Sequence, residues 1–351
     1  MGDVLHLMPA LSDLMAAQSN VVVDWMVEDS FAEIPTWHPS VDRVIKVSTR
    51  RWRSLRWQNL KEFFAFVKEL RGQSYDLVID AQGLMKSAAI ARFAKLEKGG
   101  VRAGFSGRSI KESPAAKLYH QRIDVEREQH AIDRLRQLFS GVFNYDVPSE
   151  TLNYSLKLPK SLKPLKSKQA QNTIMLFHGT TWATKHLPDQ LWRDIADLAC
   201  NDGYKVLLAW GNEAERKRAN WVAELRSEIS VLDRSTLTDL AHTIASIDGA
   251  IAVDTGLGHM AAALGVPCVS AYGSTNAALT GAKGENQALI QSEYACSPCL
   301  LKSCPKLVSS DDVDAKVAEN ASVPPCYIAS AVNPELSADA IWKRLTKQIR
   351  Q

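Results

Sequence analysis

Short apolar runs alternate with helix-like segments along most of the chain. Runs rich in β-branched residues occur at Asn20–Val27, Val41–Val47 and Tyr75–Asp80, and the apolar residues of Leu60–Leu70 recur at helical spacing. Because the runs are continuously apolar rather than alternating, they predict strands of a parallel sheet that is covered on both faces. The pattern therefore predicts an α/β fold.

The alternation stops at Leu156–Asn172, which is rich in Lys, Ser and Pro, and then starts again. The second series predicts strands at Thr173–Phe177, Tyr204–Trp210, Ile229–Leu232, Gly249–Val253 and Cys268–Tyr272, and helices at Pro188–Asn201, Leu257–Leu264 and Ser337–Gln351. A chain of 351 residues suits two cores. We therefore predict two doubly wound, Rossmann-like domains with a ligand cleft between them. The predicted parts are an N-terminal domain (1–158), a linker (159–172), a C-terminal domain (173–335) and a terminal helix (336–351).

The first residues, Met1–Pro9, are typical of the loop and helix start that follow a first strand. In a doubly wound sheet the first strand is usually central. We therefore expect the missing strand to lie upstream of Met1.

Charge is distributed unevenly between the two halves. The formal net charge is +3, which argues against a general polyanion binder, so no nucleic-acid partner is expected. Residues 1–170 carry 26 basic and 19 acidic side chains, whereas residues 171–351 carry 16 and 20. A +7 half joined to a −4 half predicts that only the N-terminal half faces an anionic partner.

Several signals predict a cytoplasmic protein. No apolar run approaches the ~20 residues that cross a bilayer, and no signal peptide is visible. Six cysteines without an export signal indicate free thiols in a reducing compartment.

The strongest local signal is the segment from Ala252 to His259. A predicted buried strand ends at Asp254, Thr255 and Gly256 form a tight turn, and Leu257 begins a helix. Free amides and the positive end of the helix dipole at such a turn bind phosphate groups. The alternative is an ordinary strand–turn–helix with an N-cap, in which His259 is a structural helix histidine.

Two further strand ends carry polar side chains. Thr180 and Thr181, followed by Lys185, come after the first strand of the second series, and their hydroxyls and ammonium suit phosphate oxygens. Glu215 comes after the next strand, where an acidic residue can accept hydrogen bonds from ribose hydroxyls. The alternatives are a polar loop with a solvated lysine and a charge at a helix N-terminus.

Other common motifs are absent from the sequence. It has no Gly-x-Gly-x-x-Gly, no Walker A sequence and no Gly-x-Ser-x-Gly elbow. The basic excess concentrates at Arg50, Arg51 and Arg53, whose guanidinium groups suit carboxylates and phosphates. The alternative is a solvated surface loop.

Four cysteines in the C-terminal half could supply thiolates to a structural zinc ion: Cys296, Cys299, Cys304 and Cys326. The second pair lacks the Cys-x2-Cys spacing, which weakens this hypothesis.

Together these segments resemble the lipopolysaccharide heptosyltransferases of glycosyltransferase family 9. The similarity covers nearly the whole chain and favours the heptosyltransferase I subgroup. Its most specific part is Ile79–Ala88 (IDAQGLMKSA), which is typical of that subgroup. The other matching segments are Met1–His6, Pro9–Leu11, Phe31–His38, Arg50–Arg53, Glu128–Ala131 and Val253–His259.

The resemblance implies a GT-B fold and inverting transfer of L-glycero-D-manno-heptose from ADP-heptose to the inner Kdo of Kdo–lipid A. It implies that Asp3 is the general base and that Lys185 acts at the leaving diphosphate. The implied donor ligands are Thr180, Thr181, Lys185, Glu215, Asp254, Thr255, Gly256, Leu257 and His259. The implied acceptor ligands are Arg50, Arg51, Arg53 and Lys111, with Lys111 at a place where an enterobacterial relative has Arg.

Because helix amides and Lys185 can stabilise the leaving group, we expect no catalytic metal and no cofactor. We also expect reversible contact of the basic half with the anionic cytoplasmic face of the inner membrane. Two alternatives remain open. One is a heptosyltransferase II-like enzyme, and the other is a non-catalytic protein that binds a nucleotide sugar or lipid A.

Overall fold

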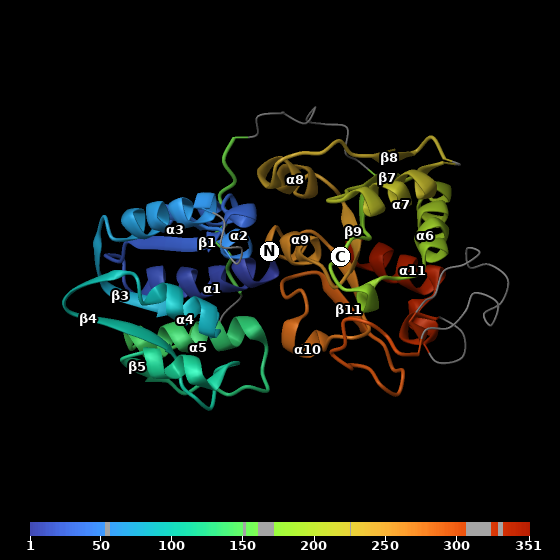
Figure 1. The fold of residues 1–351 in the computed structure, drawn as a ribbon. Helices are drawn as coiled ribbons and strands as arrows, with labels where there is room; N and C mark the ends of the chain where they lie inside the picture. Colours follow the sequence, from blue (N-terminus) through green and yellow to red (C-terminus); the bar gives the residue numbers. More distant parts are fainter. Residues whose placement is uncertain (53–56, 150–151, 161–171, 225, 307–323, 329–332) are drawn as a thin grey trace. The chain divides into compact units, whose positions relative to one another are not determined.

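The computed structural model describes residues 1–52, 57–149, 152–160, 172–224, 226–306, 324–328 and 333–351. The chain divides into two compact units, Asp3–Pro159 and Lys160–Gln351 (Figure 1). Most of the predicted linker, residues 161–171, lies outside the described residues, as does Arg53.

The strands of the first unit form two short parallel sheets. In one sheet β1 pairs with β2, and in the other β4 lies between β3 and β5. Among the described strands no ladder joins β1 to β3. Its helices and strands are α1 (Gly2–Ala17), β1 (Val23–Glu28), β2 (Val41–Val47), α2 (Thr49–Trp52), α3 (Trp57–Leu70), β3 (Ser74–Asp80), α4 (Met85–Ala91), β4 (Lys95–Phe105), β5 (Gln121–Ile123) and α5 (Ala131–Phe143), with short 3-10 turns at Asp29–Phe31, Ile34–Trp37 and Ser113–Leu118.

Helix α1 begins at Gly2, without the loop that the sequence suggested for its first residues. Leu5, Met8, Leu11 and Leu14 recur at helical spacing and are at most 2% exposed. This apolar stripe explains why the segment is helical and buried on one side, because such a face has to pack against a core.

Asp80 closes β3 and organises the loop that follows it. Its carboxylate accepts hydrogen bonds from the amides of Gln82 and Gly83 and from the hydroxyls of Ser87 and Tyr119, at 2.6–3.1 Å. Burial, followed by this contact, raises the pKa of Tyr119, so its hydroxyl stays protonated and can donate. The Ile79–Ala88 segment therefore has a structural role in holding the start of α4.

The second unit is built on one six-stranded parallel sheet with the order β11-β10-β9-β6-β7-β8. Three strands have the predicted bounds, and the terminal helix is slightly shorter than predicted. The elements are β6 (Thr173–Phe177), α6 (Asp189–Asn201), β7 (Lys205–Leu208), α7 (Glu213–Ala223), β8 (Ile229–Val231), α8 (Leu237–Ile244), β9 (Gly249–Val253), α9 (Gly256–Ala263), β10 (Cys268–Tyr272), α10 (Ala277–Thr280), β11 (Gln287–Gln291) and α11 (Ala338–Ile349), with 3-10 turns at Ala183–Lys185, Pro325–Tyr327 and Pro334–Leu336.

One large apolar cluster of the second unit lies on the face of this sheet that α6 and α11 cover. Trp192 and Leu345, from these two helices, are fully buried, and they belong to the same apolar cluster as Ile174 and Ile251 of the central strands. Every residue of β6, β9 and β10 is buried, which accounts for their continuous apolar sequences. The strand order is that of a doubly wound nucleotide-binding sheet. The order in which the parallel strands follow one another across the sheet reverses between β6 and β9.

Candidate active site

The reversal point of the second sheet brings two of the predicted sequence motifs together. In open α/β sheets, ligands bind outside the carboxyl ends of the strands at the point where the strand order reverses. Here β6 leads to Thr180 and β9 leads to Asp254, and the hydroxyl of Thr180 donates to the backbone oxygen of Asp254 at 2.9 Å. The two motifs therefore form one site.

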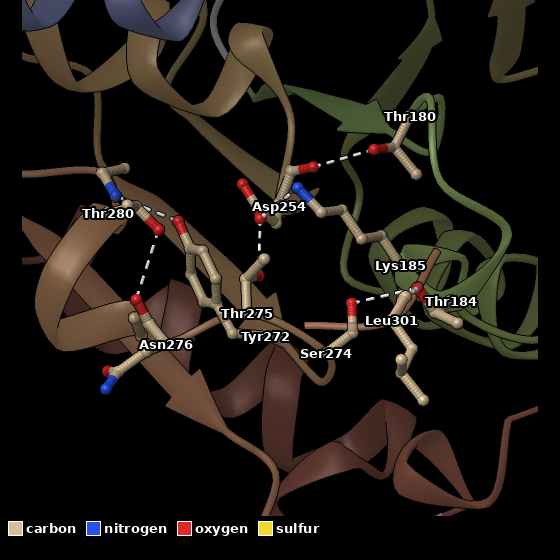
Figure 2. A network of polar contacts seen from close by, with 12 residues as sticks. Thr180, Thr184, Lys185, Asp254, Tyr272, Ser274, Thr275, Asn276, Thr280 and Leu301 are labelled. Atoms are coloured by element: carbon tan, nitrogen blue, oxygen red, sulfur yellow. Dashed lines mark hydrogen bonds and ion pairs between the residues drawn. The ribbon is translucent and has the colours of Figure 1, made fainter. Parts of the chain in front are cut away.

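Asp254 is the centre of a small polar network (Figure 2). Its Oδ2 atom lies 2.6 Å from Nζ of Lys185 and accepts a hydrogen bond from the hydroxyl of Thr275, also at 2.6 Å. The side chains of Lys185 and Asp254 are only 14% and 9% exposed. Both donors bond to the same oxygen, and the ion pair is largely shielded from water. These contacts fix the orientation of the carboxylate and the position of the ammonium.

The loop that carries Lys185 is held from a second direction. The hydroxyl of Thr184 donates to the backbone oxygen of Leu301 at 2.6 Å and lies 3.1 Å from the hydroxyl oxygen of Ser274. Nζ of Lys185 lies 4.5 Å from the centre of the Trp182 ring, within the range of a cation–π contact. These contacts position the ammonium before any ligand binds.

Helix α9 begins directly after Asp254 and Thr255. Thr255 is its N-cap and makes no capping hydrogen bond with its side chain, so the first amides of α9 are not capped by this residue. Gly258 packs closely on the sheet, because a Cβ atom there would lie 3.3 Å from Cβ of Ala252. The start of α9 thus brings a positive dipole end beside Lys185 and Asp254, which suits a diphosphate.

The other predicted donor ligands occupy different places in the second unit. Thr181 is exposed after Thr180, and Gly256 and Leu257 form the half-exposed first turn of α9. His259 lies one turn further along α9 and is 7% exposed.

Glu215 lies in the first turn of α7, where its carboxylate has structural partners. It accepts hydrogen bonds from the amide of Gly211 at 2.7 Å and from the side-chain amide of Asn212 at 2.8 Å. These contacts are those of a carboxylate at a helix N-terminus, which is the alternative that the sequence left open for Glu215. The carboxylate also faces the end of β6, because a Cβ atom on Gly179 would lie 2.7 Å from its Oε1.

The predicted acceptor residues and the predicted base belong to the first unit. Asp3 is exposed in the first turn of α1, and Lys111 is exposed between β4 and the turn at Ser113–Leu118. Arg51 is engaged already, because its guanidinium donates to Glu62 and to the hydroxyl of Ser48, both at 2.6 Å.

Arg51 also lines a pocket of the first unit with a volume of about 280 Å³. The pocket has mixed charge and is lined by Asp29, Lys46, Ser48, Arg51, Trp52, Glu62, Ala65, Phe66 and Glu69. Arg50 lies in α2, on the segment that borders this pocket.

The structure does not provide the predicted zinc site. Within the described residues, which include all four candidate cysteines, no three His, Cys, Asp or Glu side chains are placed to hold a metal ion. Cys296 is exposed and Cys326 is buried. Burial, and then the neighbouring cysteines, raise the pKa of the Cys326 thiol to about 12, so this thiol keeps its proton.

Sequence reasoning missed Thr275, Thr184 and Ser274. Ser274 and Thr275 follow β10, so they too lie at the carboxyl end of a central strand. Hydroxyl side chains soon after a predicted central strand could have identified these two residues from the sequence. Thr184 shows no such signal, because its role depends on a carbonyl that is 117 positions away in the sequence.

Comparison with known proteins shows the family to which the chain belongs. Residues 63–308 match the family model for glycosyltransferase family 9 (heptosyltransferase). The chain belongs to glycosyltransferase family 9. The family membership predicted from the sequence is thus confirmed, and the chain is a glycosyltransferase with a GT-B fold.

Individual members of the family are similar to the chain over most of its length. The chain is 42% identical to lipopolysaccharide heptosyltransferase 1 of Pseudomonas aeruginosa, over 89% of this chain and 87% of the relative. It is 38% identical to lipopolysaccharide heptosyltransferase 1 of Escherichia coli K12, over 82% and 89% of the two chains. Among solved structures, E. coli heptosyltransferase WaaC with ADP matches with a TM-score of 0.76 and 36% identity, covering 83% of this chain and 90% of that one.

Proposed function

We propose that this family 9 enzyme moves L-glycero-D-manno-heptose from ADP-heptose to the inner Kdo of Kdo–lipid A, with inversion at the anomeric carbon. The observation that carries the proposal is the Lys185–Asp254 pair at the carboxyl ends of β6 and β9, beside the start of α9. The support from relatives is that two similar proteins are named heptosyltransferase 1 and that a related structure contains ADP-2-deoxy-2-fluoro heptose.

In this proposal the second unit binds the donor. The ammonium of Lys185 and the first amides of α9 contact the diphosphate, and the hydroxyls of Thr180 and Thr181 add hydrogen bonds. Glu215 accepts from the ribose hydroxyls. As the bond between the anomeric carbon and the diphosphate breaks, negative charge grows on the departing oxygen, and a preorganised ammonium stabilises it.

The acceptor side contributes the base and the anion-binding groups. Asp3 removes the proton from the attacking Kdo hydroxyl as its oxygen bonds to the anomeric carbon. Arg50, Arg51, Arg53 and Lys111 contact the carboxylates and phosphates of the acceptor. The exposure of Asp3 suits a carboxylate that a bulky acceptor must reach.

The location of the reaction follows from the acceptor. With a lipid-linked acceptor and a nucleotide-sugar donor, the proposed reaction takes place at the cytoplasmic face of the inner membrane. Among the described helices, none is both long enough and apolar enough to cross a bilayer. In this proposal the contact with the membrane is peripheral.

The decisive experiment compares two acceptors in an assay with labelled ADP-heptose. Transfer to Kdo–lipid A, with little transfer to an acceptor that already carries heptose, is the expected result. The opposite preference would assign the chain to the heptosyltransferase II type of acceptor. Donor binding without transfer to either acceptor would contradict the proposed reaction.

The role of Asp3 has its own test. Asp3→Asn should reduce kcat by at least about 100-fold while the affinity for ADP-heptose stays unchanged, because a lost general base slows only the chemical step. The measurement pairs steady-state kinetics with calorimetric donor binding. Near-normal turnover would remove Asp3 from the role of base.

A further inference from the structure

The outward face of α3 carries four exposed side chains at helical spacing: Trp57, Lys61, Phe64 and Lys68. Trp57 is 70% exposed and Phe64 is 66% exposed, which is unusual for such large apolar side chains. On a helix these four positions fall within about 60° of one another. We call this set the α3 stripe.

The core of the first unit does not use the α3 stripe. The opposite face of α3 packs through Phe66 and Leu70, which are 4% and 2% exposed, and through the partly buried Phe63 and Val67. That face lies against β2, which contributes Ile45 to the same cluster. Folding therefore leaves the exposure of Trp57 and Phe64 unexplained.

Basic and aromatic groups alternate along the stripe. Nζ of Lys61 lies 5.6 Å from the centre of the Trp57 ring. Tryptophan is favoured at the boundary between water and lipid, and a lysine beside it can reach an anionic headgroup while its carbon chain covers apolar surface. Phe93 is 38% exposed and its ring lies 5.4 Å from that of Phe63, which adds apolar surface at the border of the helix.

Acidic side chains lie outside the stripe. Glu62 and Glu69 are turned away from it by roughly a third of a turn around the helix. Glu62 is also paired with Arg51 at 2.6 Å. The stripe itself therefore carries only positive charge.

We propose that the α3 stripe docks on the surface of an anionic phospholipid bilayer, with α3 lying in the plane of the interface. Two aromatic side chains on one helix offer too little area for a stable protein interface, which needs about 800 Å² from each partner. They are sufficient for reversible insertion of an amphipathic helix face, in which lysines add attraction to anionic lipid. The proposal rests on the peripheral membrane contact of the proposed function and assigns that contact to the α3 stripe, and it is tested without either substrate.

The test measures co-sedimentation of the full-length protein with vesicles. One set contains equal parts of phosphatidylethanolamine and phosphatidylglycerol, and the other contains phosphatidylcholine only. The wild-type protein should bind the anionic vesicles, bind the neutral ones at least about tenfold more weakly, and dissociate as salt is raised. Trp57→Ser with Phe64→Ser, and separately Lys61→Glu with Lys68→Glu, should each reduce binding to anionic vesicles about tenfold.

Matched variants control for nonspecific effects. Val22→Ser removes an apolar side chain that is 76% exposed elsewhere in the first unit, and it should leave binding unchanged. Lys343→Glu with Lys347→Glu reverses two exposed charges on α11 and should also have no effect. Thermal unfolding of each variant checks folding, and the single Phe64→Ser change serves if a double variant is unstable.

Three outcomes would overturn the proposal. In the first, both stripe variants bind the anionic vesicles as strongly as the wild-type protein does. In the second, the wild-type protein binds no vesicles, and in the third it binds the two kinds of vesicle equally. A wild-type dimer that the Trp57 and Phe64 changes dissociate in sedimentation velocity would assign the stripe to self-association instead. Because no sugar donor or acceptor is present, each of these outcomes leaves the proposed reaction standing.

Discussion

Asp254 holds two donors on one carboxylate oxygen, and this arrangement determines the state of Lys185 before the donor binds. The ammonium and the carboxylate are largely shielded from water, so each compensates the charge of the other. A diphosphate that reaches the start of α9 meets an ammonium that already has one partner and can still donate from its other N–H bonds. Lys185 can therefore contact the leaving group without losing its position.

Lys185→Met should affect activity and stability together. We expect kcat/KM for the donor to fall about 100-fold, because an electrostatic contact to the leaving group is lost. We also expect the second unit to lose about 3 kcal/mol of unfolding free energy, because Asp254 stays buried as an unpaired charge. Adding Asp254→Asn should restore stability without restoring activity, as urea titration and kinetics can check. A stable single variant would contradict the buried ion pair.

In the proposed function Thr275 is a positioning residue, because it acts through Asp254. Thr275→Val keeps the shape of the side chain but removes the hydrogen bond to the carboxylate at 2.6 Å. We expect about tenfold weaker binding of ADP, since hydrogen bonds to charged groups contribute about 1.5–3 kcal/mol. Thr275→Ser keeps the hydroxyl and should restore most of the affinity. Equal affinities of the Val and Ser variants would show that the hydroxyl has no such role.

At the scale of elements, one ion pair links α2 to α3. Arg51 on α2 contacts Glu62 on α3, and both side chains are partly exposed, so the pair contributes little to stability. In the proposed reaction, an anionic acceptor competes with Glu62 for the same guanidinium.

Glu62→Gln should therefore lower KM for the acceptor about two- to fivefold, a free-energy change typical of an exposed ion pair. The kcat value and the affinity for ADP should not change. Steady-state kinetics with varied Kdo–lipid A measures this. Arg344 and Glu335 form a comparable, partly exposed pair in the second unit, so Glu335→Gln serves as the control. An increase in the acceptor KM on Glu62→Gln would mean that Glu62 assists the acceptor.

The central strands of the second sheet were predictable because they are buried on both faces. β6, β9 and β10 each consist of five buried residues, and their sequences are continuously apolar. β4 was not predicted, because its first part, Lys95–Gly99, is mostly exposed and it becomes buried only from Arg102 onward. β11 was missed for a related reason, since Gln287 and Gln291 bound a half-buried edge strand.

The candidate site was predictable to a similar extent. Lys185, Thr180 and Asp254 follow strand ends, so topology alone brings them together. The partners of Arg51 and Glu215 were not visible, because ion pairs and caps depend on which side chains the fold places within 3 Å. For the same reason the cysteine spacing suggested a zinc site that the described residues do not form.

At the scale of the whole molecule, both units contain a histidine that burial keeps neutral. Burial lowers the pKa of His38 and of His178 to about 4, from an ordinary value of 6.5. A group whose pKa is lower in the folded state binds its proton mainly after unfolding. Folding is therefore unaffected above pH 6.5, and its stability falls as the pH decreases from 6.5 towards 4.

We expect a loss of about 2 kcal/mol per histidine between pH 6.5 and 5. Urea titrations at several pH values measure it. His38→Gln should remove the contribution of the first unit and leave that of the second. A stability that is independent of pH over this range would contradict the buried, neutral state of these rings.

The strand order of the second sheet also constrains how the site can form during synthesis. Thr180 and Asp254 are joined by a hydrogen bond although 74 positions separate them in the sequence. A nascent chain therefore makes β6, β7 and β8 long before the strand that completes the site is available, and closing such a long loop is slow. In the proposed function, nucleotide binding requires that the two halves of this sheet have joined, so ADP would stabilise only chains that have completed the sheet.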